Sequence, residues 1–258
     1  QSNMEWHVRQ CANPQEEIAK ANYSKIRLFD VPGHTVHPLP QREGKGSWRV
    51  CSSDSVARFS ATGYYFGRRI HLSLGVPVGL IGSNWGGTRI EPWTTLDGFK
   101  SVSELSEEAK NVAAYTKDTK VNGRTPSAIY NSMVHPLTPY ALRGAIWYQG
   151  ESNGNEGVTY YQKKHALVKG WRKAFQNPNL GFYWVQLCNF RKPNVVEIKD
   201  PKQEESRPEG GDGWAKLREA QTQALDLKHS GMAVIIDLAD THNPVSYTHL
   251  TLPTIQPV

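Results

Sequence analysis

The sequence predicts an α/β fold in which helices cover both faces of a doubly wound parallel sheet, giving three layers. Short apolar runs alternate with amphipathic stretches along most of the chain. Its 258 residues are enough to bury one large core. Hydrophobic residues make up 38% of the chain and charged residues 21%, which is typical of a globular protein. We therefore expect one large domain.

Hydrophobic periodicity locates the individual elements. Residues 54–74 predict an amphipathic helix, and the apolar run 76–81 predicts a buried strand that ends in small residues. The elements predicted downstream are a strand at 143–148, a helix at 158–175, a strand at 181–187, a helix at 214–227 and a strand at 232–238. We also expect a polar surface helix at 102–119 and a long charged loop at 192–213.

Composition narrows the classes of partner. The net charge of +6 arises from basic residues spread along the chain, and pairs such as Arg68 and Arg69 fit a solvated helix face. No basic run or zinc-finger spacing occurs, so nucleic-acid binding rests on the net charge alone and we expect no such partner. No apolar run reaches the roughly eighteen residues of a membrane helix, so we expect no membrane span. The three cysteines form no ligand cluster, and we expect neither a metal nor another cofactor.

Three separate blocks carry the residue types that acyl transfer by a serine requires: a nucleophile, and hydrogen-bond donors for the oxyanion. Ser2 lies in the opening block Gln1-Ser-Asn-Met-Glu-Trp6 and is the candidate nucleophile. Gly86 and Gly87 follow the predicted strand 76–81, where a missing Cβ lets a backbone N–H approach a ligand. Gln149 ends the strand 143–148, and its amide is a candidate third donor.

Taken in this order, the blocks resemble the SGNH/GDSL hydrolases, and within them the sialate O-acetylesterase group. The resemblance extends to residues 76–93, 130–137 and 217–221, and so covers about the first 240 residues. It implies an SGNH/flavodoxin-like sheet whose first strand, preceding Ser2, is missing from this chain. It also implies a periplasmic or secreted protein, although no signal peptide is visible.

The resemblance implies roles for individual residues. Ser2 is the nucleophile, and Gly86 or Gly87 together with Gln149 completes the oxyanion hole. Residues that bind the substrate or orient its neighbours are then Asn3, Arg89, Trp93 and Glu151. Several aromatic residues, Trp93 among them, are candidates for a wall on which a sugar stacks, with core packing as the alternative.

The pattern breaks in the last block, where the family places a histidine as general base directly before proline. Here the chain reads Asp237-Leu-Ala-Asp-Thr-His-Asn-Pro244, so His242 follows Asp240 by two positions but is separated from Pro244. The base is therefore His242, with Asp240 as its acidic partner, or a histidine that this chain has lost. A protein without its base is expected to be weakly active or inactive.

The run 245–254 resembles one reading frame of a transposase adapter used in sequencing libraries. The alternative is a natural terminal strand, since Val245, Tyr247 and His249 alternate with polar residues. We expect an SGNH-type esterase domain over residues 1–243, truncated at both ends, and a non-native tail over 244–258.

These observations predict a serine carbohydrate esterase that removes O-acetyl groups from sugars through an acyl-enzyme, with an acetylated carbohydrate as its partner. The same blocks fit an esterase of xylan or another polysaccharide, because they report acyl chemistry and not the identity of the sugar. A carbohydrate-binding protein without catalysis is the alternative from another class, and it is favoured by the absence of the expected histidine and by the eight tryptophans.

Overall fold

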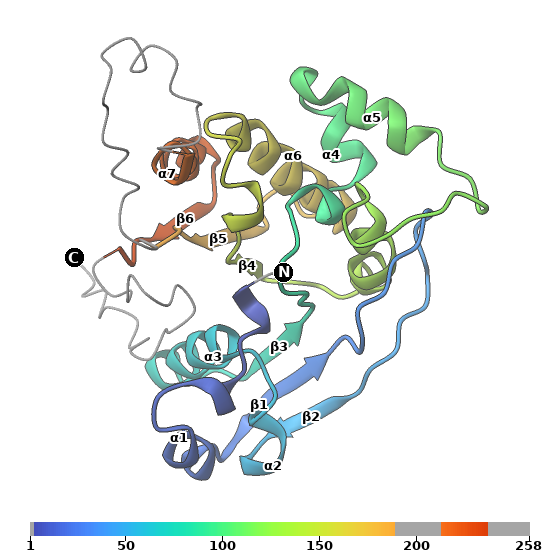
Figure 1. The fold of residues 1–258 in the computed structure, drawn as a ribbon. Coiled ribbons are helices and arrows are strands. Elements are labelled where there is room, and N and C mark those ends of the chain that lie inside the picture. The colour runs from blue at the N-terminus through green and yellow to red at the C-terminus, as the bar shows by residue number, and fades with distance from the viewer. Residues whose placement is uncertain (1–2, 189–212, 237–258) are drawn as a thin grey trace, which may run out of the picture.

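The structure is a computed structural model that describes residues 3–188 and 213–236. Its strands form two three-stranded sheets, in the orders β2-β1-β3 and β4-β5-β6 (Figure 1). The strands are β1 Tyr23–Asp30, β2 Trp48–Cys51, β3 Val78–Gly82, β4 Gly144–Trp147, β5 Gly181–Val185 and β6 Ser230–Ala233. The α helices are α1 Pro14–Lys20, α2 Ser53–Val56, α3 Ala61–Leu74, α4 Leu96–Lys100, α5 Ser106–Ala113, α6 Thr159–Ala174 and α7 Gly213–Gln223. Shorter helical turns include η1 Asn3–Glu5, η3 Glu91–Trp93, η7 Glu151–Asn153 and η9 Ala224–Asp226.

The α/β class is confirmed, but the sheets are not entirely parallel. Strand β1 pairs in parallel with β3, and β5 pairs in parallel with both β4 and β6. Strand β2 instead runs antiparallel to β1. Antiparallel neighbours need no crossover helix, and the connection 31–47 contains none. The expectation of a first strand before Ser2 is not tested by the described residues and stays a prediction.

The first sheet packs one face against α2 and α3. Ile26 and Leu28 of β1 are buried there with Val56 and Tyr64. Gly67 brings α3 close to β3, because a Cβ at this position would lie 2.6 Å from Leu80 Cδ1. This close approach explains a glycine inside a helix.

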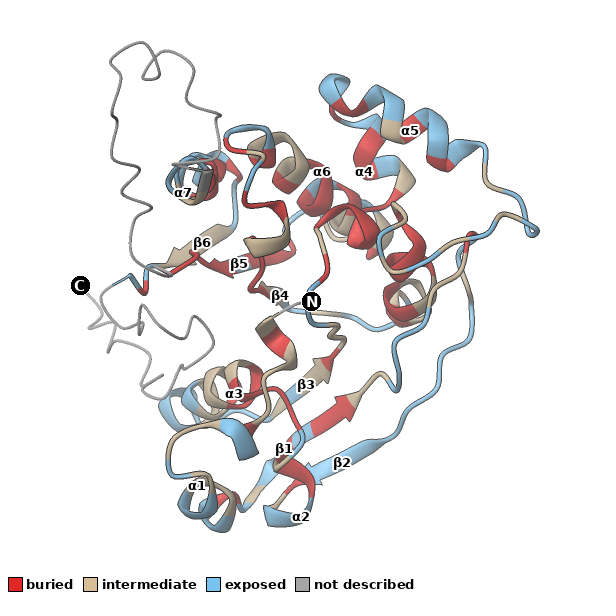
Figure 2. Ribbon diagram, viewed as in Figure 1, coloured by how far each residue is buried: buried red, intermediate tan, exposed pale blue. Residues whose placement is uncertain are grey.

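The second sheet lies over the largest core cluster. Trp147 of β4 and Phe182 and Trp184 of β5 are buried with Leu167 of α6 and Leu217 of α7. Figure 2 shows buried positions along β5 and on α6, whereas much of α5 is exposed. The two helices therefore cover the tryptophan-bearing face of this sheet.

Most predicted elements are confirmed with shifted ends, namely the strands near 76–81, 143–148 and 181–187 and the helices near 158–175 and 214–227. The single helix predicted at 54–74 is wrong. It is two helices, because Ser60 starts α3 by accepting a hydrogen bond from Gly63 N–H at 3.1 Å.

Two further predictions change, and two others are not tested. The helix expected at 102–119 ends at Ala113, and the strand expected at 232–238 is displaced to Ser230–Ala233. Nearly all of the predicted loop 192–213, and the predicted tail 244–258, lie outside the described residues. Among the helices that are described, none has the length and apolar composition to cross a membrane.

A buried ionic cluster joins the loop after β3 to the segment after β4. Lys163 Nζ of α6 lies 2.7 Å from both Glu91 Oε1 and Glu156 Oε2. Arg89 pairs with the same two carboxylates, and Asn153 Nδ2 donates to both at 3.1 and 3.0 Å. Burial alone would raise the pKa of Glu91, but Lys163, Arg89 and Asn153 outweigh it and hold that pKa below its usual value. The buried Glu91 and the partly buried Glu156 are thus compensated by two cations.

Lys164, the next residue, has the opposite environment. Its side chain is fully buried, and its Nζ has no hydrogen-bond partner among the residues that the structure describes. The amine lies 5.2 to 5.3 Å from the ring centroids of Trp147, Tyr160 and Trp184. Aromatic faces favour a cation, but burial is the stronger effect and lowers the pKa of Lys164 well below its usual value.

We expect Lys164→Met to raise the free energy of unfolding by about 1–3 kcal/mol at neutral pH, because it removes a buried amine without a partner and keeps most of the side-chain volume. Since the folded-state pKa is the lower one, the unfolded wild type binds more protons between the two pKa values. Wild-type stability should therefore rise with pH toward the ordinary lysine value of about 10.4, and the variant should lack this rise. Urea unfolding at several pH values measures both effects, and a destabilised variant with the wild-type pH profile would contradict the prediction.

Lys163→Met provides the matched comparison on the same helix. It leaves Glu91 and Glu156 with one cation fewer, so we expect it to lower the free energy of unfolding by about 3–5 kcal/mol. The loss should shrink as the pH falls and the two carboxylates take up protons. The same urea titrations test this prediction. Equal changes in the free energy of unfolding in the two lysine variants would show that the ionic cluster does not stabilise the fold.

Candidate active site

The described parts of all three sequence blocks meet at the carboxyl ends of β3 and β4. Figure 1 shows the first described residues, in dark blue, between these two strands. Asn3 N–H donates to Tyr148 O at 3.0 Å, which attaches the opening block to the end of β4. Asn3 Nδ2 also donates to Glu151 Oε1 at 2.5 Å. Residues separated by about half of the chain are thereby held together.

The diglycine turn completes this junction. Gly86 N–H donates to Glu5 Oε2 in the opening block, and Ser152 Oγ donates to Gly87 O at 3.0 Å. Gly87 has φ of +71°, in the left-handed region that favours glycine, and open space where a Cβ would project. Glycine at position 87 is therefore explained by its backbone conformation, and the role of the pair in the oxyanion hole stays a prediction.

The proposed catalytic residues themselves are not all described. Ser2, His242 and Asp240 lie outside the described residues, and their roles stay predictions. Asn3, the neighbour of Ser2, is fixed by the two hydrogen bonds given above. The opening block is thus anchored directly beside the candidate nucleophile.

Gln149 is fully buried, and its amide is already engaged. Its Nε2 donates to Asn153 Oδ1 at 2.7 Å and to Thr88 O at 3.2 Å. Its Oε1 accepts from Tyr160 O–H at 2.8 Å. Both amide hydrogens have partners, so in this conformation the side chain offers no donor to a ligand. The predicted role in the oxyanion hole requires these bonds to change.

Glu151 accepts hydrogen bonds from the opening block and from its own block. Burial raises the pKa of its carboxyl, while the hydrogen bonds from Asn3 and from backbone N–H groups oppose that rise. Gly150 N–H donates to Glu151 Oε2 at 3.1 Å. The carboxylate thus connects the opening block to the third block, and its orienting role toward a substrate stays a prediction.

The side chains of Arg89 and Trp93 already have partners within the protein. Arg89 pairs with Glu91 and Glu156 and also donates to Ser152 O at 3.2 Å. Trp93 is fully buried, and its Nε1 donates to Thr88 Oγ1 at 3.0 Å. A buried indole cannot stack on a sugar, so the expectation for Trp93 is wrong and the alternative of core packing is confirmed for it.

Several residues at the junction were missed by sequence reasoning, among them Glu5, His34 and Asn153. His34 Nε2 lies 2.6 Å from Glu5 Oε1. The His34 ring stacks on Trp85, with centroids 4.7 Å apart and planes 6° from parallel. Glu5 and Asn153 do lie in the quoted blocks, which was the available signal. His34 has no such signal, because only folding brings it to this turn.

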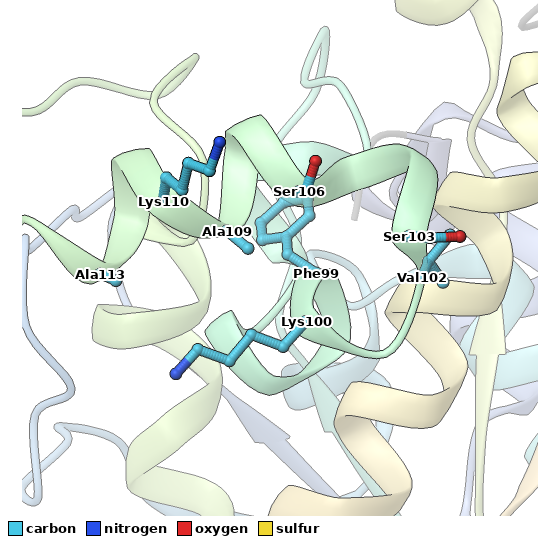
Figure 3. A pocket seen from close by; sticks show the side chains of 8 residues that line it. All are labelled: Phe99, Lys100, Val102, Ser103, Ser106, Ala109, Lys110 and Ala113. Carbon is cyan, nitrogen blue, oxygen red and sulfur yellow. The ribbon is translucent and has the colours of Figure 1, made fainter.

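A cavity of about 330 Å³ lies away from this junction, between α4 and α5. Figure 3 shows its lining, with the Phe99 ring at the centre and the Lys100 and Lys110 side chains at the sides. None of its lining residues is a predicted site residue, so we place the candidate site at the three-block junction. Within the described ranges, no group of His, Cys, Asp and Glu is arranged to hold a metal ion.

Comparison with known proteins identifies the family of this chain. The family model for carbohydrate esterases described as sialic acid-specific acetylesterases matches residues 1–252. The sialate O-acetylesterases of Pongo abelii and Homo sapiens are each 29% identical over 96% of this chain. The match covers 48% of each of those proteins, so the chain spans about half the length of the curated relatives it matches.

Two solved structures are also similar. A carbohydrate acetylesterase from Xanthomonas citri superposes with a TM-score of 0.78 and 32% identity, over 96% of this chain and 52% of that one. A protein from Arabidopsis thaliana, with a TM-score of 0.51 and 16% identity, covers 90% of this chain and 78% of that one, and it supports the fold alone. Because the family match spans nearly the whole sequence, the chain belongs to the sialic acid-specific acetylesterase family of carbohydrate esterases.

Proposed function

We propose that the protein is a serine esterase that removes O-acetyl groups from carbohydrates through an acyl-enzyme. The observation that carries the proposal is the junction of the three blocks, where Asn3, Gly87 and Glu151 lie together although they are distant in sequence. Family membership and the likeness to a carbohydrate acetylesterase support the acetyl ester as substrate.

The proposed reaction has two steps. Ser2 Oγ attacks the acetyl carbonyl carbon while the base, His242 paired with Asp240, accepts the serine proton. A backbone N–H of the diglycine turn stabilises the oxyanion. The bond between the acetyl carbon and the sugar oxygen then breaks as the base returns the proton to that oxygen, which leaves as a hydroxyl. Water then attacks the acetyl-enzyme with the same base, which releases acetate and regenerates Ser2.

The sugar is proposed from the names of the relatives. Sialate O-acetylesterases suggest an O-acetylated sialic acid, and the bacterial carbohydrate acetylesterase leaves acetylated xylan or another polysaccharide as an alternative. Initial rates of acetate release from the two classes of sugar distinguish them. We also propose a periplasmic or secreted location, where such sugars occur.

The proposal of binding without catalysis loses part of its support. The tryptophan content favoured it, but Trp93, Trp147 and Trp184 are buried in the core. Affinity for an acetylated sugar without any release of acetate would restore this alternative.

Ser2→Ala should lower kcat for p-nitrophenyl acetate by at least about 1,000-fold, because removing a triad nucleophile leaves only the contribution of binding and the oxyanion hole. Ser106→Ala, an exposed serine beside the cavity in Figure 3, is the matched control and should retain wild-type activity. Steady-state kinetics of the two variants measure kcat and so test whether Ser2 is the nucleophile. Undiminished hydrolysis by Ser2→Ala would remove the proposed mechanism.

A further inference from the structure

We propose that His34 contacts the sugar of the acetylated substrate, and that Glu5 is the positioning residue that holds the His34 ring beside the diglycine turn. This inference rests on the proposed esterase function and names a specificity-determining residue for it. His34 lies in the connection between β1 and β2, outside the three sequence blocks, and folding brings it to the candidate site.

Glu5 joins His34 to the diglycine turn through the two oxygens of one carboxylate. Its Oε1 lies 2.6 Å from His34 Nε2, and its Oε2 accepts from Gly86 N–H. Glu5 also ends the helical turn η1, which begins at Asn3, directly after the candidate nucleophile. Because the sugar is joined to the acetyl carbon through one oxygen, a ring this close to the turn is within reach of the sugar.

The His34 ring is held on one face and at one edge. It stacks on Trp85, with centroids 4.7 Å apart and planes 6° from parallel. Trp85 is supported in turn by the loop at Gly123, where a Cβ would lie 2.9 Å from the indole Cη2. The opposite face of the imidazole and its Nδ1 edge are left to solvent, and 44% of the His34 side chain is exposed. By contrast, Trp93 and Trp147 are fully buried and cannot contact a sugar.

The backbone on both sides of His34 is fixed by hydrogen bonds. Before it, Val31 N–H donates to Gly82 O at 2.8 Å, at the end of β3. After it, Thr35 Oγ1 accepts from Ser132 Oγ at 2.7 Å. A side chain that is already held in place loses little conformational freedom when a ligand binds, and this favours affinity.

The Glu5 carboxylate also determines which nitrogen of His34 is offered to a ligand. An ionised carboxylate only accepts hydrogen bonds, so in the neutral ring Nε2 carries the hydrogen and Nδ1 has an available lone pair. Nδ1 is bonded to no residue that the structure describes. It can therefore accept from a sugar hydroxyl while the exposed ring face packs on the C–H groups of the sugar. An apolar face with one oriented polar group is typical of small-molecule sites.

The kinetic test measures kcat/KM on an O-acetylated sialic acid, on an acetylated xylo-oligosaccharide and on p-nitrophenyl acetate, which carries no sugar. For the sugar that wild type hydrolyses faster, we expect His34→Ala to lower kcat/KM about 10-fold more than for p-nitrophenyl acetate, mainly through a higher KM. His34→Gln should recover part of this loss, because its amide oxygen can accept from a hydroxyl. His71→Ala is the matched control and should match wild type on all substrates, because His71 contacts Val76 O at the opposite end of β3.

Two kinetic results would overturn the proposal while leaving the esterase function intact. One is an unchanged kcat/KM for the sugar in His34→Ala, and the other is an equal loss on the sugar and on p-nitrophenyl acetate. A structural role is tested separately by urea unfolding. A half-exposed ion pair contributes little to stability, so His34→Ala should keep the wild-type midpoint, and a large fall would also overturn the proposal.

Binding to Ser2→Ala, in which turnover is blocked, gives a readout that does not depend on activity. Titration with each of the two acetylated sugars should shift the imidazole NMR resonances of His34 for the sugar that binds, and adding His34→Ala should raise Kd about 10-fold. Inactive wild type would end the esterase function, but this titration would still show whether His34 contacts the sugar. Unshifted His34 resonances with an unchanged Kd would overturn the inference.

Discussion

The pairing of Glu91 and Glu156 with Lys163 and Arg89 is the constraint on which the candidate site depends. These charges come from the loop after β3, the segment after β4 and helix α6. Taking them out of water is costly, and their mutual pairing and the Asn153 hydrogen bonds compensate for it. If either loop moved, buried charge would be left without a partner. The cluster therefore fixes where the two loops stand relative to each other.

The site is built outward from this cluster through hydrogen bonds. Asn153 spans both carboxylates and accepts from Gln149, whose amide also holds Thr88 O at the diglycine turn. The opening block is attached from the other side through Asn3 and Glu5. An esterase benefits from such an arrangement because donors fixed beforehand need not reorganise as charge develops. The rigidity comes from side chains that do not themselves contact the reacting atoms.

Hydrophobic periodicity predicted several elements whose burial is one-sided or complete, although it missed the partly buried strand β1. Strands β3, β4 and β5 and helix α6 were found because their apolar residues fall at the expected spacing. Strand β2 was missed because three of its four residues are exposed, so no apolar pattern marks it. The break between α2 and α3 was missed because it depends on the Ser60 cap and not on apolar spacing. Boundaries were thus decided by local hydrogen bonds that hydrophobic patterns do not encode.

The sequence by itself determined the class of fold, the three blocks and the family, because apolar spacing and block order are properties of the chain alone. Only the tertiary structure decided the parts that depend on distant partners. It assigned Arg89 to an ionic cluster, Trp93 to the core and the Gln149 amide to internal hydrogen bonds. It also brought Glu5 to Gly86 and Ser152 to Gly87. A polar side chain is available to a ligand only when it has no partner within the folded protein. Which side chains find such partners depends on packing in three dimensions, and the sequence alone does not show it.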